Sequence, residues 1–325
     1  MDERASIQSV SFSGHESFPL RFAWLTKAVR GVVEDAALFT RDDAVVRLGV
    51  GKNMVRAMRH WATRADMIRP APRDARGVHY KPTEIGHLLF GPKGLDPYLE
   101  DPATIWSVHW QLCSRSSPLD SRSGEIASPT TWYFLLNEFR ETSFTVESAV
   151  DNLLRYAERA SGKRPSKGTI ERDVSCFVRS YAASEPNAKF SREDTYDSPL
   201  VELAIITREA ETGRLVIDRS RRLTLSPHIF AYAVADLWRR RSPHSETLSL
   251  QQVAYEPGGP GQVFRLPENA CVDLLETLHD TTRGLMSFDS TAGIRQLIRH
   301  GEMPDPALLL KQHFRARKAR VTSAA

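Results

Sequence analysis

The alternation of apolar and polar positions in the first quarter of the chain predicts a helix-turn-helix. Asp42 and Asp43 favour a helix start, and the mostly apolar run that follows them, through Leu48, supplies its buried side. The Gly49-Val50-Gly51 triplet breaks this pattern and is interpreted as a turn. After the turn, apolar residues return at helical spacing: Met54, Val55, Met58, Trp61 and Ala62. The second helix therefore has one face suited to packing.

The other face of this second helix is polar and basic, and it comprises Lys52, Asn53, Arg56, Arg59 and His60. A helix enters the DNA major groove when one side packs and the other presents donors to phosphates and base edges. Arg56 or Arg59 is suited to guanine, and Asn53 to adenine. Lys52, near the helix start, is suited to phosphate. The alternative is a solvated basic face on a module that docks proteins.

A first helix and a β-hairpin complete the pattern of a winged helix. Residues 22–33 predict an amphipathic helix, and residues 67–82 predict two strands around a polar loop. That loop carries Arg73 and Arg76, and the second strand carries Lys81. These cations are candidate DNA contacts of the wing. Thr83 is placed to cap a last short helix.

The fold expected for the whole chain is mainly α, of the α+β class. Turn signals divide it into an N-terminal winged-helix DNA-binding domain (1–91), a central, mostly helical domain with a small β-hairpin (92–242) and a C-terminal winged-helix-like domain (243–325). We expect a helix from Ser143 to near Ala160, and an extended segment at 263–266. The chain ends in a basic tail, either a nucleic-acid arm or a solubilising end, with Arg315, Arg317 and Lys318.

Composition indicates a soluble globular protein of a reducing compartment. The chain has 325 residues, of which 41% are hydrophobic, and a net charge of +4, which permits a sizeable core in two or three domains. Cys113, Cys176 and Cys271 are odd in number and far apart, which does not fit a disulfide framework or a zinc site. No apolar run is long enough to span a membrane, and no signal-sequence pattern opens the chain. We expect a cytoplasmic protein with no membrane partner.

Two polar strings carry the candidate catalytic residues. His15 and Glu16 lie side by side among Gly and Ser residues, an arrangement able to orient a metal, a water or a phosphate. The alternative is a hydrogen-bonded structural histidine. Asp197 and Glu202 are the best candidate carboxylates for a divalent metal, since hard cations need oxygen ligands. The alternative there is a pair of surface carboxylates, because the lysine that a PD-(D/E)xK nuclease needs after its second acid is absent.

Three strings together resemble a bacterial family catalogued as a domain of unknown function: residues 12–18, 48–56 and 197–203. Members of that family sit with sulfur-transfer and ATPase proteins in DNA phosphorothioation gene clusters, and the resemblance extends from Phe12 to Arg299. It implies a nickase that opens one strand of double-stranded DNA for sulfur incorporation in anti-phage defence. The implied partners are a cysteine desulfurase, an ATPase and an ATP-pyrophosphatase-like subunit.

The resemblance supplies no catalytic motif that transfers residue by residue, and no HNH, GIY-YIG or PD-(D/E)xK signature is visible. Phosphodiester hydrolysis usually relies on Mg²⁺ or Mn²⁺ held by carboxylates. The hypotheses are His15 as general base with Glu16, or Asp197 and Glu202 as metal ligands. One alternative is a non-catalytic DNA-binding subunit or a transcription regulator, which would be a homodimer on a palindromic site. Another is a scaffold that docks partner proteins.

Overall fold

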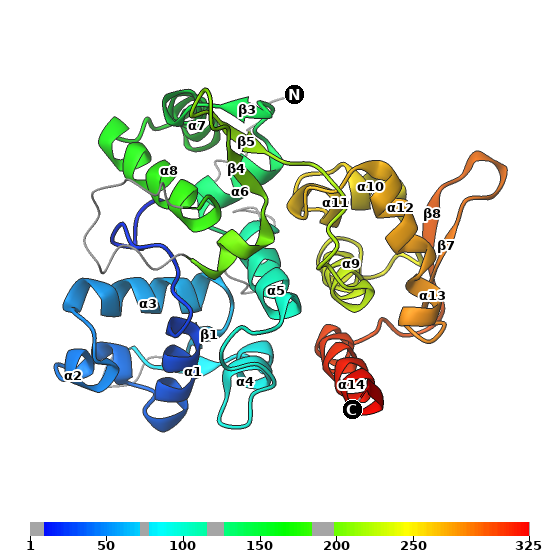
Figure 1. Ribbon diagram of the computed structural model, residues 1–325, viewed down its shortest axis with the longest axis horizontal. Coiled ribbons are helices and arrows are strands. Elements are labelled where there is room, and N and C mark those ends of the chain that lie inside the picture. The colour runs from blue at the N-terminus through cyan, green and yellow to red at the C-terminus, as the bar shows by residue number, and fades with distance from the viewer. Residues whose placement is uncertain (1–9, 72–77, 116–126, 184–197, 325) are drawn as a thin grey trace, which may run out of the picture. The chain divides into compact units, whose positions relative to one another are not determined.

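A computed structural model describes the chain except for residues 1–9, 72–77, 116–126, 184–197 and 325 (Figure 1). Helices dominate, and the described strands form one two-stranded and two three-stranded antiparallel sheets. The predicted α+β class is confirmed. The chain forms two compact units, one made of residues 1–101 and 111–218 and the other of residues 102–110 and 219–325. The domain boundaries expected after residues 91 and 242 stay predictions.

The N-terminal part of the first unit contains, in chain order, α1 (Trp24–Glu34), η1 (Leu38–Thr40), α2 (Ala44–Leu48), α3 (Lys52–Arg64), β1 (Ile68–Pro70), β2 (Tyr80–Pro82) and α4 (Glu84–Phe90). Helix α1 packs against α3, α4 and both strands. Gly49 ends α2 with a left-handed φ of 64°, so the predicted turn is confirmed. The Thr83 hydroxyl accepts a hydrogen bond from the Gly86 N–H, which confirms the predicted cap.

The rest of the first unit contains α6 (Thr130–Asn137), β3 (Ser143–Phe144), α7 (Val146–Ser161), α8 (Lys167–Tyr181), η3 (Pro199–Leu203), β4 (Ile206–Arg208) and β5 (Leu215–Ile217). Strand β5 lies between β3 and β4, and α8 packs against α6 and α7. The predicted hairpin is confirmed. The helix expected to open at Ser143 begins later, because Ser143 lies in β3 and Thr145 supplies the side-chain cap.

The second unit contains most of α5 (Pro102–Cys113), then α9 (Pro227–Arg241), β6 (Thr247–Ser249), α10 (Leu250–Ala254), α11 (Pro260–Val263), α12 (Glu268–Glu276), α13 (Leu278–Thr281), β7 (Met286–Asp289), η4 (Thr291–Gly293), β8 (Gln296–Arg299) and α14 (Pro306–Ala324). Strand β8 lies between β6 and β7, and α14 packs along α9. The extended segment expected at 263–266 is wrong. Val263 ends a helix, and Phe264 keeps a right-handed helical backbone.

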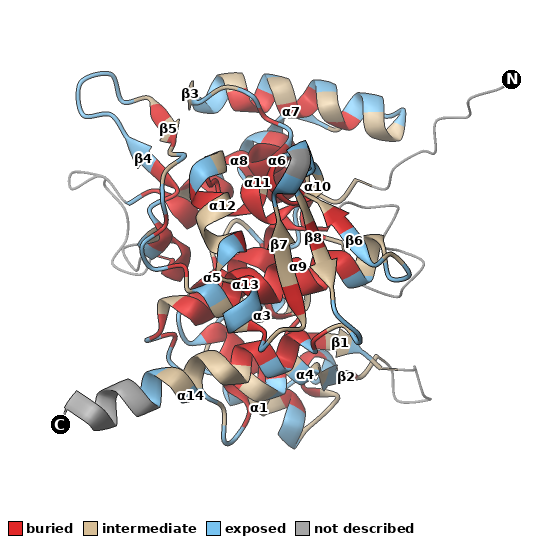
Figure 2. Cartoon of the chain, turned by 90° about the vertical axis from the view of Figure 1, so that its right-hand side faces the viewer, coloured by how far each residue is buried: buried red, intermediate tan, exposed pale blue. Residues whose placement is uncertain are grey.

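Large side chains fill the core of this second unit, and Figure 2 shows buried residues along α9. His109 and Trp110 are both 0% exposed. Burial lowers the pKa of His109 to about 4, and its Nε2 lies 2.8 Å from the Val263 carbonyl oxygen. These residues are therefore part of the core. Among the helices that the structure describes, none is both long and apolar enough to cross a membrane.

Candidate nucleic-acid interface

Helix α3 separates a basic face from a packed face. Its residues Lys52, Asn53 and Arg56 are exposed, and Arg59 is half-buried. The buried side consists of Val55, Ala57, Met58, Trp61 and Ala62. The amphipathic division predicted for this helix is confirmed, and its basic residues face solvent over the first two turns.

His60 differs from the other polar residues of α3, because its ring is turned inward. The ring meets Trp61 edge-on, with centroids 5.2 Å apart, and lies 5.9 Å from the His15 ring. Burial, and then the nearby Arg64 charge, lower the pKa of His60 well below its usual value, so the ring is neutral at pH 7. The predicted DNA contact of His60 stays a prediction, and this placement disfavours it.

The start of α3 is open to an approaching anion. Its N-cap residue is Gly51, so no side chain satisfies the first N–H groups of the helix. A Cβ placed on Gly49 or Gly51 would meet no atom within 4 Å. Free N–H groups and the positive end of the helix dipole favour phosphate at such a terminus. The sequence identified these glycines only as a turn.

The Phe12 to Phe18 string forms a strained loop beside α3. Ser13, Gly14, Glu16 and Ser17 have φ values of 66°, 88°, 49° and 63°. A left-handed backbone costs a residue other than glycine on the order of 1 kcal/mol. The loop therefore depends on contacts that hold it in this conformation.

Asp173 of α8 provides the main anchor for this loop. Its Oδ1 accepts from the Ser13 N–H at 2.8 Å and lies 3.1 Å from His15 Nε2, while its Oδ2 accepts from the Thr131 hydroxyl at 3.1 Å. The Ser17 N–H donates to His15 Nδ1 at 3.0 Å. Nδ1 is thus the bare nitrogen, and Nε2 donates its proton to Asp173. His15 and Asp173 are 2% and 1% exposed.

Further contacts join the loop to α3 and fix the position of Glu16. The indole N–H of Trp61 donates to the Phe18 carbonyl at 2.9 Å, and the Arg179 guanidinium donates to the Ser17 carbonyl. Between these anchors, Glu16 Oε1 lies 3.8 Å from Arg56 Nη1 on the exposed face of α3. The two side chains are 34% and 50% exposed. The structure thus brings a candidate catalytic acid together with a candidate DNA contact.

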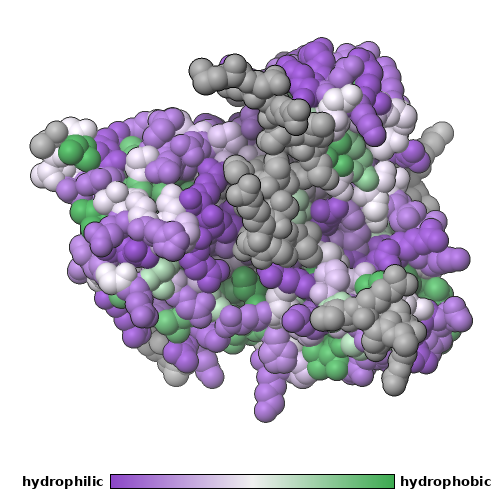
Figure 3. Space-filling view, turned by 180° about the vertical axis from the view of Figure 1, so that it is seen from behind, coloured by the Kyte–Doolittle hydropathy of each residue, from purple (hydrophilic) through white to green (hydrophobic). Residues whose placement is uncertain are grey.

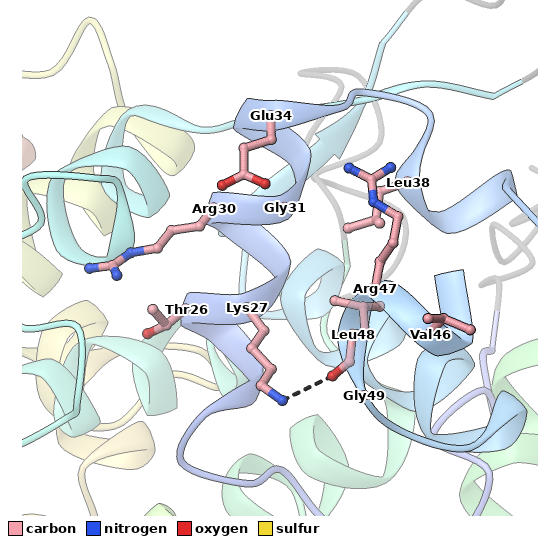
Figure 4. Close-up of a pocket in the computed structure, with 10 residues that line it drawn as sticks. All are labelled: Thr26, Lys27, Arg30, Gly31, Glu34, Leu38, Val46, Arg47, Leu48 and Gly49. Carbon is pink, nitrogen blue, oxygen red and sulfur yellow. Dashed lines mark hydrogen bonds between the residues drawn. The ribbon is translucent and has the colours of Figure 1, made fainter. Parts of the chain in front are cut away.

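A pocket of about 470 Å³ lies beside α1 and α2 (Figure 4). Three cations line it, namely Lys27, Arg30 and Arg47. Lys27 donates to the Leu48 carbonyl at 2.9 Å, and the other two donate to the Phe90 carbonyl and the Asp35 carboxylate. All three cations therefore brace neighbouring elements of the fold.

Comparison with protein families identifies the family to which this chain belongs. Residues 12–314 match a family described as "Protein of unknown function (DUF4007)". This chain belongs to the DUF4007 family. The family resemblance predicted from the three sequence strings is thereby confirmed. No curated protein matches the chain.

Two solved structures resemble this DUF4007 protein over most of its length. One is described as a magnesium ion-bound SspB crystal structure, with 29% sequence identity and a TM-score of 0.84. The other is described as an SspB crystal structure, with 29% identity and a TM-score of 0.83. In both cases the match covers 96% of this chain and 90% of the SspB chain.

The other site residues predicted for this DUF4007 protein fall in several places. Lys81 is exposed on β2, and Glu202 is exposed in η3, where partial burial raises its pKa. Asp197, Arg73 and Arg76 lie outside the described residues. The tail residues Arg315, Arg317 and Lys318 are exposed on α14 in the second unit. The roles expected for all of these residues stay predictions.

The described residues of this DUF4007 protein show no preformed cluster of metal ligands. They contain no group of three or more His, Cys, Asp or Glu side chains that could hold one. Both ring nitrogens of His15, and both carboxylate oxygens of Asp173, are engaged in hydrogen bonds within the protein. Coordination by either side chain would require those bonds to break.

Proposed function

We propose that this protein binds double-stranded DNA through α3 and acts in DNA phosphorothioation for anti-phage defence. The observation that carries the proposal is the exposed group Lys52, Asn53 and Arg56 on a helix whose opposite side is buried. Such a helix can present its donors to base edges while its core face holds it in place. The open N-terminus of α3 adds backbone donors for a phosphate.

The order of elements supports a winged-helix layout for this region. Helices α1, α2 and α3 precede the antiparallel pair β1 and β2, which is the arrangement of a helix-turn-helix followed by a wing. Lys81 on β2, with Arg73 and Arg76 in the connecting segment, would extend the contact along the DNA backbone. Each cation that neutralises a phosphate makes the affinity more sensitive to salt.

We further propose that the protein nicks one DNA strand, as the family resemblance implies. The magnesium ion in one of the similar SspB structures favours a divalent metal, Mg²⁺ or Mn²⁺, in this reaction. His15, Glu16, Asp197 and Glu202 remain the candidate residues. His15 could accept a proton only after its ring leaves Asp173 or Ser17, because both nitrogens are engaged. Its tight burial makes a structural role the stronger alternative.

The partners proposed with this activity are a cysteine desulfurase, an ATPase and an ATP-pyrophosphatase-like subunit. The non-catalytic alternative is a DNA-binding subunit that recruits such proteins, and it needs only the exposed face of α3. A transcription regulator would instead require a homodimer on a palindromic site.

The test combines two measurements on the full chain with one plasmid. Conversion of supercoiled DNA to open circles is followed with Mg²⁺, with Mn²⁺ and with EDTA, beside a mobility shift at increasing salt. We expect binding that weakens steeply with salt, and nicking that EDTA abolishes. Binding without nicking would place the chemistry in a partner. Weak binding that does not change with salt concentration would refute the proposal that the protein binds DNA, and would favour a role in docking partner proteins.

A further inference from the structure

Glu16 places a negative charge on a face otherwise suited to a polyanion. Its Oε1 lies 3.8 Å from Arg56 Nη1 and forms an ion pair on the exposed side of α3. Lys52, Asn53 and Arg59 complete that side. A carboxylate beside these groups opposes the approach of phosphate. Its position therefore requires an explanation if α3 binds DNA.

The backbone holds Glu16 where it is. Its φ is 49°, and both neighbours are anchored: His15 by Asp173, and the Ser17 carbonyl by Arg179. The loop is attached to α3 itself through the indole N–H of Trp61. These hydrogen bonds hold the Glu16 Cα beside α3, while its exposed side chain is free to rotate.

Stability does not account for this arrangement. A solvent-exposed ion pair contributes little to folding, since water and salt screen it. A left-handed backbone at a residue other than glycine costs more than such a pair returns. The buried hydrogen bonds of Ser13 and His15 offset the strain of the loop, whereas the exposed pair of Glu16 with Arg56 adds little to stability. The place of this carboxylate on the basic face of α3 therefore points to a role in binding.

We infer that Glu16 is a specificity-determining residue of the α3 interface, a conclusion that rests on the proposed DNA binding. While Arg56 is paired with Glu16, it does not contact a phosphate. It leaves Glu16 for the edge of a guanine, which offers the guanidinium two acceptors. The freed Glu16 carboxylate then accepts from the amino group of a cytosine. Where no G·C pair is available, the carboxylate stays beside the phosphates and weakens binding. The ligand class is a duplex with a G·C pair at this position.

The experiment compares the full-length wild type with Glu16→Gln, which keeps the shape of the side chain and removes its charge. Affinity is measured by fluorescence anisotropy on a mixed-sequence duplex, and base preference by selection from a random duplex pool. For Glu16→Gln we expect about two- to fivefold tighter binding to the mixed-sequence duplex, with a weaker G·C preference. Glu147→Gln makes the same charge change on exposed α7 and should alter neither result.

The Arg56→Ala background separates specificity from simple charge. There, Glu16→Gln should cause a smaller loss of G·C preference than it causes in the wild type, because the guanidinium that Glu16 directs is gone and only the contact with cytosine remains to be lost. If the wild type binds the duplex and Glu16→Gln has the same affinity and base preference, the inference about Glu16 is wrong while the proposed function stands. A wild type without salt-sensitive duplex binding would remove the proposed function, and the inference with it.

Discussion

At the scale of single residues, the loop beside α3 depends on a buried polar contact. Asp173 accepts hydrogen bonds from donors on three separate residues, and the Ser17 N–H occupies the remaining nitrogen of His15. A buried carboxylate is tolerated when several donors satisfy it. The contact between His15 and Asp173, which lie 158 positions apart in the sequence, therefore anchors the loop.

Two glycines of the first unit offer a matched test of this loop. Gly14 and Gly49 both have a left-handed φ, of 88° and 64°. A Cβ on Gly14 would lie 2.5 Å from His60 Nδ1, whereas one on Gly49 would meet no atom within 4 Å. Gly49→Ala should cost about 1 kcal/mol from backbone strain alone. Gly14→Ala should cost more, because the His60 ring is packed against Trp61.

The measurement for these variants is the urea midpoint of each full-length protein beside wild type. Equal midpoints for Gly14→Ala and Gly49→Ala would mean that the loop can move away from α3 without loss of packing.

His109 predicts how stability depends on pH. Burial lowers its pKa to about 4 in the folded protein, below the ordinary value of 6.5. The unfolded chain therefore binds the proton first, so the stabilising contribution is present above pH 6.5 and is lost as pH falls toward 4. At pH 5 the loss relative to pH 8 should be about 2 kcal/mol.

Urea unfolding of wild type and His109→Gln at both pH values measures this term. The amide of Gln keeps a donor for the Val263 carbonyl but does not titrate. Between pH 8 and pH 5, the variant should lose about 2 kcal/mol less free energy of unfolding than the wild type. An identical loss in both proteins would show that other groups control the acid response.

At the scale of elements, helix α3 is the part whose character the sequence predicts best. Its two faces follow from helical periodicity, and the cap of α4 follows from Thr83. These features depend on residues within one or two turns of each other. The prediction of an extended segment at residues 263–266 was wrong because a short apolar run fits a strand and a helix equally well.

The environment of His15 could not be predicted in the same way. The sequence places His15 beside Glu16, but the partners of His15, Asp173 and Trp61, come from α8 and α3. Only tertiary packing brings these elements to the loop. The same holds for Glu16, whose pairing with Arg56 joins residues 40 positions apart by their numbering. The sequence offers both alternatives for this string, a functional site and a structural histidine, but it does not show the tertiary contacts of His15.

The basic face of α3 yields a direct prediction for duplex binding. If Arg56 or Arg59 reads a base, its replacement by Ala should weaken binding to the preferred duplex by about 1 to 3 kcal/mol and relax the preference at one position. Arg172→Ala, which removes an exposed arginine from α8, is the matched control and should leave binding unchanged. Titration by fluorescence anisotropy measures all three. Wild-type affinity in both α3 variants would refute the proposal that α3 docks in the major groove.

At the scale of the whole molecule, hydrophilic residues predominate on the face shown in Figure 3, and hydrophobic residues form separate small areas there. Exposed large hydrophobic side chains occur in both units, and Val46 and Leu223 are examples. Because the net charge is a modest +4, the proposed binding to DNA would rely on local clusters of cations. Two such clusters are the face of α3 in the first unit and the α14 tail in the second.

The salt dependence of DNA affinity can reveal whether both clusters contact the backbone. Each phosphate contact contributes a slope of about −0.9 to log K against log salt. Replacing Arg315, Arg317 and Lys318 together by Ala should reduce the slope by roughly one for each residue that touches a phosphate. Base preference should stay unchanged, because phosphate contacts carry no sequence information. An unaltered slope would identify the tail as a solubilising end, whereas a lost base preference would contradict the assignment of base reading to α3.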